Sequence, residues 1–591
     1  MEPVLSGRSR WLQTLGALVW TTCFVFLWAW WIHPEHIGGI FPFLTATATL
    51  LWVTLTPAYF LLIFRNSRRP SSAIEIPPEL RIAMVVTKAP SEPLDLVIKT
   101  LTAMLEQDVP HDTWLADEAP TPEILNWAEL HGVKVSTRFG VTDYHRSSWP
   151  RRTRCKEGNL AYFYDHYGYD LYDVVVQLDA DHVPEQGYLR AMVQPFADPA
   201  VGYVSAPSIC DSNANQSWSA RGRLYAEASL HGSLQAGYNG GWAPLCIGSH
   251  YAVRTAALRQ IGGLGPELAE DHSTTLMMNS GGWRGVHAID AIAHGLGPAS
   301  FADLAVQEFQ WSRSLVTILL QHTGQHLGNL PFKLKFQFLF SQLWYPIFAI
   351  VMLLSVMMPI LALAFDFTFV NVAYFDFLLH FLPMAGLLIV LAFAWRATGT
   401  FRPYNAKIVS WENAVFVFAR WPWAILGTIA AIVDTLAHRR TEFRVTPKAS
   451  SEAQDLPLSV LAPYACISIV SGLAAFAIHD IRAASGYYLF AALNAAVYAL
   501  VLAIILIAHR RENRVERRDV PWLARTGTVA VLSILPLAAV GQHGLDILDA
   551  VAWNSNVRFT ETKFSVAGAG MGQTARRSFS FSIKWPGAGD S

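Results

Sequence analysis

The feature that most constrains this chain is a set of apolar stretches long enough to cross a membrane. A spanning helix needs roughly 20 apolar residues. Only 15% of the residues are charged, against roughly 25% in a soluble protein. The sequence therefore predicts a membrane protein with about six or seven spans. The clear stretches are 11–32, 41–64, 343–365, 374–395, 458–478 and 486–508, and a weaker one covers 522–541.

Lysine and arginine residues indicate the orientation of these spans, because short cytoplasmic loops carry an excess of both. They flank the first two spans at Arg8 and Arg65, are absent between Lys335 and Arg396, and return in 396–457. This alternation places the N-terminus and the long segment between the second and third spans on the cytoplasmic side. We expect a multi-pass protein of the bacterial inner membrane.

Two further apolar segments are interpreted as amphipathic helices that lie in the membrane interface. Counting 411–440 as a span would place the arginine-rich flank that follows it on the wrong side of the membrane. The expected order is a transmembrane hairpin, a cytoplasmic domain, an interface helix, a second hairpin, an interface helix with a loop, a C-terminal transmembrane region and a flexible tail. Their ranges are 1–69, 70–330, 331–342, 343–395, 396–457, 458–541 and 542–591.

Residues 70–330 alternate between strand and helix patterns. Apolar strands at 80–88 and 173–179 flank segments with helical spacing of apolar residues. This order predicts an α/β, Rossmann-like domain with a mainly parallel sheet, in which ligands bind beyond the carboxyl ends of the strands. The net charge of −1 gives no general attraction to nucleic acid. Five scattered cysteines without CxxC spacing favour neither a disulfide framework nor a zinc site.

The strand "VVVQLD" ends in an acidic motif. Asp179 and Asp181 stand two residues apart at its carboxyl end, and Pro184, which we interpret as the end of the strand, follows. Carboxylates held at a strand end suit a hard divalent cation such as Mg²⁺, which proteins bind through one or two carboxylates plus substrate phosphates. The alternative is an ordinary turn, in which aspartate is common.

This acidic motif and seven others, in order across roughly residues 80 to 450, resemble those of family 2 glycosyltransferases, and closely those of bacterial cellulose synthase catalytic subunits. The motifs along the chain are "TKAPSEP", "WLADEAP", "CKEGNL", "QLDADH", "GSHYAVR", "LAEDHST", "QEFQW" and "FRVTPK". The resemblance implies a cytoplasmic domain of the GT-A fold, inserted between transmembrane helices. It also implies a UDP-sugar donor.

The resemblance assigns a role to each motif. The metal ion, Mg²⁺ or Mn²⁺, would neutralise the leaving diphosphate, and a carboxylate base would deprotonate the attacking hydroxyl. Glu270 and Asp271 are the implied catalytic pair, and because they are adjacent, like-charge proximity could raise the pKa of one of the two carboxyls. The implied residues are Asp181 and Asp179 for the metal; Thr87, Glu92, Asp117, Lys156 and Asp179 for the nucleotide, with Gly158 and Asn159 beside Lys156; Asp271 as base; Gln307, Gln310 and Trp311 for the acceptor; and Phe443, Thr446 and Lys448 in a gating loop.

Several of these residues have a simpler interpretation. Lys156 could be a solvated lysine, the residues before Asp271 an ordinary helix N-cap, and Trp311 an anchor at the membrane interface. One departure from the family pattern also stands out. Gln310 occupies the position of an arginine, so a guanidinium that would aid the diphosphate is missing; Arg313 lies close by but, on a helix, points elsewhere.

Together these observations predict a processive, inverting β-glycan synthase. It would take glucose from UDP-glucose, extend a polysaccharide acceptor and extrude it through its own helices. Cellulose, a β-1,3-glucan and a mixed-linkage glucan are all compatible products. Two alternatives stay open: a non-processive transferase that glycosylates a lipid carrier, and a non-catalytic export channel. The expected partners are the donor, the polysaccharide, the lipid bilayer and a periplasmic export protein.

Overall fold

The computed structural model describes residues 1–153, 155–439, 456–477, 485–512, 520–543, 557–568 and 571–583. Its α/β domain is built on a seven-stranded sheet in the order β11-β8-β10-β6-β3-β4-β5. The strands β6, β3, β4 and β5 run parallel, and β10 is antiparallel to both of its neighbours. The strands are β3 (Ile82–Lys88), β4 (Asp112–Asp117), β5 (Lys134–Ser136), β6 (Val174–Asp179), β8 (Val201–Ser205), β10 (His250–Arg254) and β11 (Arg284–His287).

Both faces of this sheet are covered, which explains why its central strands are apolar without alternation. On β3, Met84 and Val86 pack into one cluster, whereas Ala83 and Val85 pack into another on the opposite face. The helices that cover the sheet include α3 (Leu94–Leu105), α4 (Pro122–Leu130), α5 (Lys156–Phe163), α7 (Tyr188–Val193) and α10 (Thr255–Gln260). The sheet is therefore a rigid frame for side chains at its strand ends.

Pro184 has a different role from the one inferred from the sequence. Strand β6 already ends at Asp179, and Pro184 lies in the short strand β7 (Val183–Pro184). This strand pairs with β12 (Ala293–His294), which in turn pairs with β9 (Ser208–Ile209) to form a separate three-stranded sheet. Proline is compatible with β7 because an edge strand can leave one backbone N–H group unpaired.

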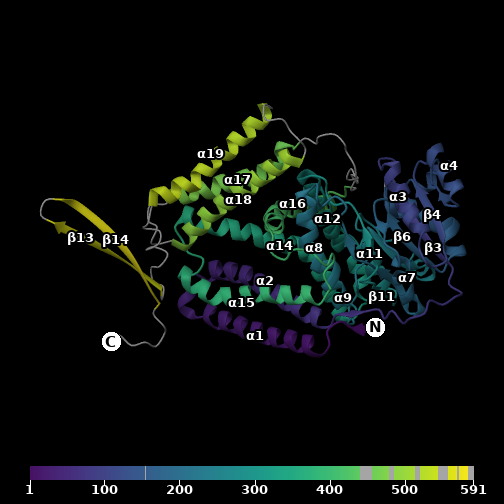
Figure 1. The fold of residues 1–591 in the computed structure, drawn as a ribbon, viewed down its shortest axis with the longest axis horizontal. Helices are drawn as coiled ribbons and strands as arrows, with labels where there is room; N and C mark the ends of the chain where they lie inside the picture. Colours follow the sequence, from purple (N-terminus) through teal and green to yellow (C-terminus); the bar gives the residue numbers. More distant parts are fainter. Residues whose placement is uncertain are drawn as a thin grey trace.

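Long apolar helices extend from one end of the α/β domain (Figure 1). Seven helices in the described residues are long and apolar enough to cross a membrane. The ends of the first hairpin meet, because β1 (Glu2–Pro3) pairs with β2 (Arg68–Arg69) beside the α/β domain. The seven are α1 (Gly7–Trp31), α2 (Ile40–Arg65), α14 (Phe332–Phe365), α15 (Tyr374–Ala397), α16 (Trp411–Leu436), α17 (Leu458–Ala477) and α18 (Ser485–Glu512).

Two details of these helices bear on the expected organisation. The range 331–342, interpreted as a separate interface helix, and the span after it lie in the single helix α14. Helix α16 has the length and composition of a span, yet it packs against α8 (Trp218–Ser229) and α12 (Phe301–Gln321), which belong to the α/β domain. The weaker stretch 522–541 lies in α19 (Val520–His543).

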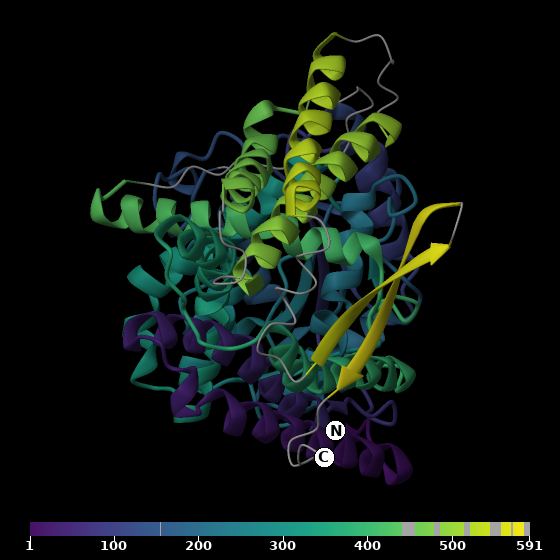
Figure 2. The same cartoon turned by 90° about the vertical axis from the view of Figure 1, so that its left-hand side faces the viewer.

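The end of the chain differs from the expected flexible tail. Strands β13 (Val557–Gly568) and β14 (Met571–Ile583) form an antiparallel hairpin. It lies at the end of the molecule opposite the α/β domain and is nearest the viewer in Figure 2. The register of the hairpin pairs Phe559 with Phe581.

Candidate functional site

The parallel strands bring the first predicted residues to one edge of the sheet. The register pairs Thr87 at the end of β3 with Asp179 on β6, and Lys88 with Asp117 on β4. Lys88 Nζ lies 3.2 Å from Asp117 Oδ2, and both side chains are buried. Because carboxyl ends of parallel strands meet at the same edge, residues from three separate motifs become neighbours. Lys88 itself was not foreseen in the sequence.

Beside this edge lies a group of side chains that could hold a metal ion. One ligand atom each from Asp179, Asp181 and His182 lies within 4.8 Å of the others. Asp181 is buried and accepts a hydrogen bond from Leu296 N–H at 2.9 Å. His182 Nδ1 is buried without a hydrogen bond to any described residue, 3.4 Å from Asp181 Oδ1. Two carboxylates and an imidazole fit a divalent cation.

Lys156, the first residue of α5, connects this acidic group to the second half of the site. Its Nζ lies 2.7 Å from Asp179 Oδ1 and donates to Gly248 O at 2.6 Å. On its other side, Gly248 N–H donates to Asp271 Oδ2 at 2.6 Å. The backbone N–H and C=O groups of Gly248 thus connect the acidic motif and the lysine with the expected base. The solvated alternative for Lys156 does not hold, because its ammonium group has these two partners.

Glu270 and Asp271 begin helix α11 (Glu270–Ser280). Burial raises the pKa of both carboxyls, and the charge of Asp271 raises that of Glu270 further. At Asp271 the backbone N–H groups of His272 and Gly248 limit the rise. Asp271 is therefore the more easily ionised of the pair, which suits a proton acceptor at neutral pH.

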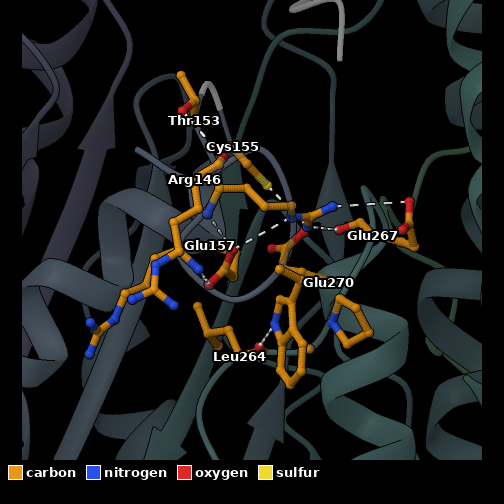
Figure 3. Close-up of polar contacts among 12 residues, drawn as sticks. Arg146, Thr153, Cys155, Glu157, Leu264, Glu267 and Glu270 are labelled. Atoms are coloured by element: carbon orange, nitrogen blue, oxygen red, sulfur yellow. Dashed lines mark hydrogen bonds and ion pairs between the residues drawn. The ribbon is translucent and has the colours of Figure 1, made fainter. Parts of the chain in front are cut away.

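A polar network borders Glu270 (Figure 3). Arg152 Nη2 donates to Glu267 O at 2.6 Å, and its Nε lies 3.6 Å from Glu157 Oε2. Figure 3 shows Glu270 close to Glu157 and Glu267, and the Arg152 charge interacts with the Glu270 carboxylate. The segment before α5 is thereby anchored next to the expected base.

Other residues of the expected nucleotide site hydrogen-bond to the backbone around the site or pack closely against it. Glu92 accepts a hydrogen bond from Ala89 N–H at 2.7 Å. Asn159 donates to Ala116 O at 2.8 Å, which fixes the end of β4 beside Asp117. Gly158 permits a close approach, because a Cβ there would lie 2.1 Å from Arg152 O.

Residues 174–397 match the family model described as "Glycosyl transferase family group 2". Residues 174–397, which include the acidic motif and α11, are thus similar to this glycosyltransferase family. The predicted fold class, an α/β GT-A domain inserted between apolar helices, is confirmed.

Curated relatives of this glycosyltransferase chain include two cellulose synthases. Cellulose synthase 2 of Novacetimonas hansenii is 24% identical over 533 residues, covering 87% of this chain and 31% of the relative. Cellulose synthase 1 catalytic subunit [UDP-forming] of Komagataeibacter xylinus is 25% identical over 269 residues, covering 44% of this chain and 34% of the relative. The chain thus spans about a third of the length of each. Among solved structures, a mannosyltransferase from Pyrobaculum calidifontis is 17% identical with a TM-score of 0.42. The match covers 66% of this chain and 98% of the mannosyltransferase chain.

The expected acceptor residues of the glycosyltransferase domain lie on α12, next to a residue that sequence reasoning missed. The Arg223 guanidinium of α8 lies over the Trp311 ring, 4.4 Å from its centroid. Its Nη1 donates to Gln307 Oε1 at 3.4 Å. Arg313 pairs with Asp434 of α16, so it does not take the place of the arginine expected at position 310. No sequence signal indicated Arg223, because it belongs to none of the recognised motifs.

Phe443, Thr446 and Lys448, the residues of the expected gating loop, lie outside the described part of the chain, which ends at residue 439 and resumes at 456. Asp290, another acidic residue of the α/β domain, is exposed and pairs with Arg402 at 2.8 Å. It is not a partner of the Gly248 network. The described candidate site therefore comprises the acidic group, Lys156, the Glu270–Asp271 pair and the α12 face.

Proposed function

We propose that this chain is a processive, inverting hexosyltransferase that moves glucose from UDP-glucose to a growing β-glucan. One observation supports the proposal most strongly: Lys156 and Gly248 join a metal-ligating acidic pair to a buried carboxylate, Asp271, at one edge of the sheet. Donor activation and acceptor deprotonation need these two kinds of group within a single sugar's reach of each other.

The donor end of the proposed reaction rests on Asp179, Asp181 and Lys156. A bound Mg²⁺ or Mn²⁺ would supply neutralising charge to the diphosphate leaving group. The carboxylates provide the oxygen ligands that such ions prefer, and the buried His182 Nδ1 provides a further ligand atom. Lys156 holds Asp179 in place and adds a positive charge to this end of the site.

At the acceptor end, Asp271 would take the proton of the attacking hydroxyl. The new bond forms between that oxygen and the anomeric carbon, while the bond from this carbon to the diphosphate breaks. Attack from the face opposite the leaving group inverts the anomeric configuration. Asp271 suits this step because two backbone N–H groups orient its carboxylate, whereas burial and the Asp271 charge favour a protonated Glu270.

The junction between the α/β domain and the helices supports a polymeric acceptor. Trp311 presents a flat ring for a sugar, and polar groups continue between α12, α14 and α16. Glu308 pairs with Arg420 at 2.9 Å, and Arg420 Nη2 lies 3.3 Å from Tyr345 Oη. Buried charges inside an apolar helix assembly are expensive and usually mark a functional path. We propose that the glucan passes here toward the periplasm of a bacterial inner membrane, where an export partner would receive it.

The direct test is product analysis with the purified protein in liposomes. Radiolabelled UDP-glucose with Mn²⁺ or Mg²⁺ should yield a polymer that precipitates in ethanol, and Asp271→Asn protein should yield none. Digestion by a β-1,4-glucanase or a β-1,3-glucanase would then assign the linkage. A label that appears only as a single sugar on extractable lipid would contradict processive synthesis. No incorporation from any UDP-sugar, with folded protein, would contradict transferase activity itself.

A further inference from the structure

Within the described residues, the "QEFQW" motif of helix α12 provides no cation that faces the proposed donor site. Gln310 stands where the resemblance of the "QEFQW" motif implies an arginine. Arg313 is held by Asp434 of α16, with Nε 2.8 Å from Oδ2. The diphosphate of the proposed donor nevertheless gains negative charge as the glycosidic bond to it breaks. A guanidinium that acts beside the metal ion and Lys156 would therefore come from another element of the fold.

Arg223 of α8 lies at this place. Its guanidinium covers the Trp311 ring and donates to Gln307, so it contacts the first and last residues of the segment that contains Gln310. The Arg223 side chain is only 12% exposed. A guanidinium carries five N–H donors, and within the described residues the contacts to Glu227 and Gln307 occupy two of them.

The packing of α8 also brings this helix close to the acidic group. One turn before it, Ala220 approaches Gly297 so closely that a Cβ on this glycine would lie 2.6 Å from the Ala220 Cβ. The residue before this glycine, Leu296, is the one whose N–H donates to Asp181. Helix α8 is thus seated on the loop that holds a proposed metal ligand.

Cys210 extends this packing to the acidic group. A Cβ on Gly297 would lie 3.2 Å from Cys210 O, and Cys210 Sγ lies 3.9 Å from His182 Nε2, beside Asp181. Gly297 and Cys210 therefore connect α8 with the acidic group.

We propose that Arg223 binds the diphosphate of the donor and supplies the guanidinium that Gln310 does not. The inference rests on the proposed function. As the acceptor oxygen bonds to the anomeric carbon, the electron pair of the breaking bond passes to the diphosphate oxygen, and the acceptor proton passes to Asp271. Arg223 neutralises the charge that develops on the diphosphate and, through its stacking contact, positions Trp311 for the incoming sugar.

The experiment measures binding of UDP and of uridine, both with Mn²⁺, to the full-length protein in detergent by calorimetry. Arg223→Gln should weaken UDP binding about tenfold or more and leave uridine binding unchanged, because uridine has no phosphate. The affinity of Arg223→Lys for UDP should lie between those of the wild-type protein and Arg223→Gln. Arg221→Gln is the matched control, since Arg221 lies on the same helix but pairs with Glu412 and should bind UDP normally.

A rescue variant separates a phosphate contact from a structural role. Adding Gln310→Arg to the Arg223→Gln protein should restore most of the lost UDP affinity and transfer rate, because the cation returns to the family position. Unchanged UDP affinity in Arg223→Gln, or an equal loss for UDP and uridine without rescue, would overturn the assignment while the proposed function stood. Wild-type protein that binds no UDP with Mn²⁺ would overturn both.

Discussion

Replacing Asp271 by asparagine removes the proposed base with the smallest change of shape. The carboxylate accepts two hydrogen bonds, from His272 N–H at 2.7 Å and from Gly248 N–H at 2.6 Å. Asparagine has one acceptor oxygen, so one of these buried donors loses its partner, which costs about 1–3 kcal/mol. Because burial disfavours the charge of Asp271, its removal offsets part of that cost. The variant should therefore fold.

The effect on the reaction should be much larger than the effect on folding. Loss of a positioned general base lowers the rate about 10²–10⁴-fold, equivalent to about 3–5 kcal/mol of activation free energy. UDP binding should persist, because Lys156 contacts the carbonyl oxygen of Gly248, whereas Asp271 contacts its N–H group. Incorporation of labelled glucose and calorimetric binding of UDP measure the two properties on the same preparation.

The pH dependence provides a second measurement. Since the ionised carboxylate accepts the proton, wild-type kcat/KM should rise with pH through the raised pKa of Asp271, and the asparagine variant should lack this rise. The folded state also binds this proton more tightly than the unfolded chain, whose aspartate pKa is about 3.9. Wild-type stability should accordingly fall as the pH rises from about 4 through the raised pKa, and the variant should escape that loss. Polymerisation by Asp271→Asn at a near wild-type rate would refute the assignment.

Three further perturbations test other parts of the site. Asp181→Asn, or EDTA with wild-type protein, should abolish transfer without unfolding the protein, and Mn²⁺ or Mg²⁺ should restore only the EDTA-treated enzyme; full activity in EDTA would exclude the metal. Gly158→Ala should misfold, because its Cβ would lie 2.1 Å from the Arg152 carbonyl oxygen, and this overpacking costs about 3 kcal/mol or more of folding free energy. Gly324→Ala is the control: nothing lies within 4 Å of its Cβ position, so this variant should elute as wild type in size-exclusion chromatography. Phe443→Ala and Thr446→Ala should reduce polymer synthesis, and UDP with Mn²⁺ should protect 441–457 from proteolysis; equal cleavage with and without the ligand would return this stretch to a plain linker.

The order of elements and the position of the acidic motif could be predicted from local sequence. The apolar strand that ends at Asp179, the helical spacing in α3 and the 20-residue apolar stretches each depend on near neighbours in the chain. Helix α8 and strand β10 were not predicted, since α8 has a weak apolar pattern and nothing local to β10 encodes its antiparallel pairing with β6. The final hairpin was also missed, because glycine and serine content outweighed its modest alternation of residues.

What the sequence alone determined, then, is which chemical groups the chain carries and that they stand at the ends of its elements, because strand and helix periodicity is a local property. Only the tertiary structure decided which of them meet. Strand register placed Lys88 against Asp117, the packing of α11 brought Asp271 to Gly248, and the crossing of α8 with α12 put Arg223 over Trp311. The physical reason is that these contacts join residues far apart in the chain, and they arise only when sheet pairing and helix packing are satisfied together.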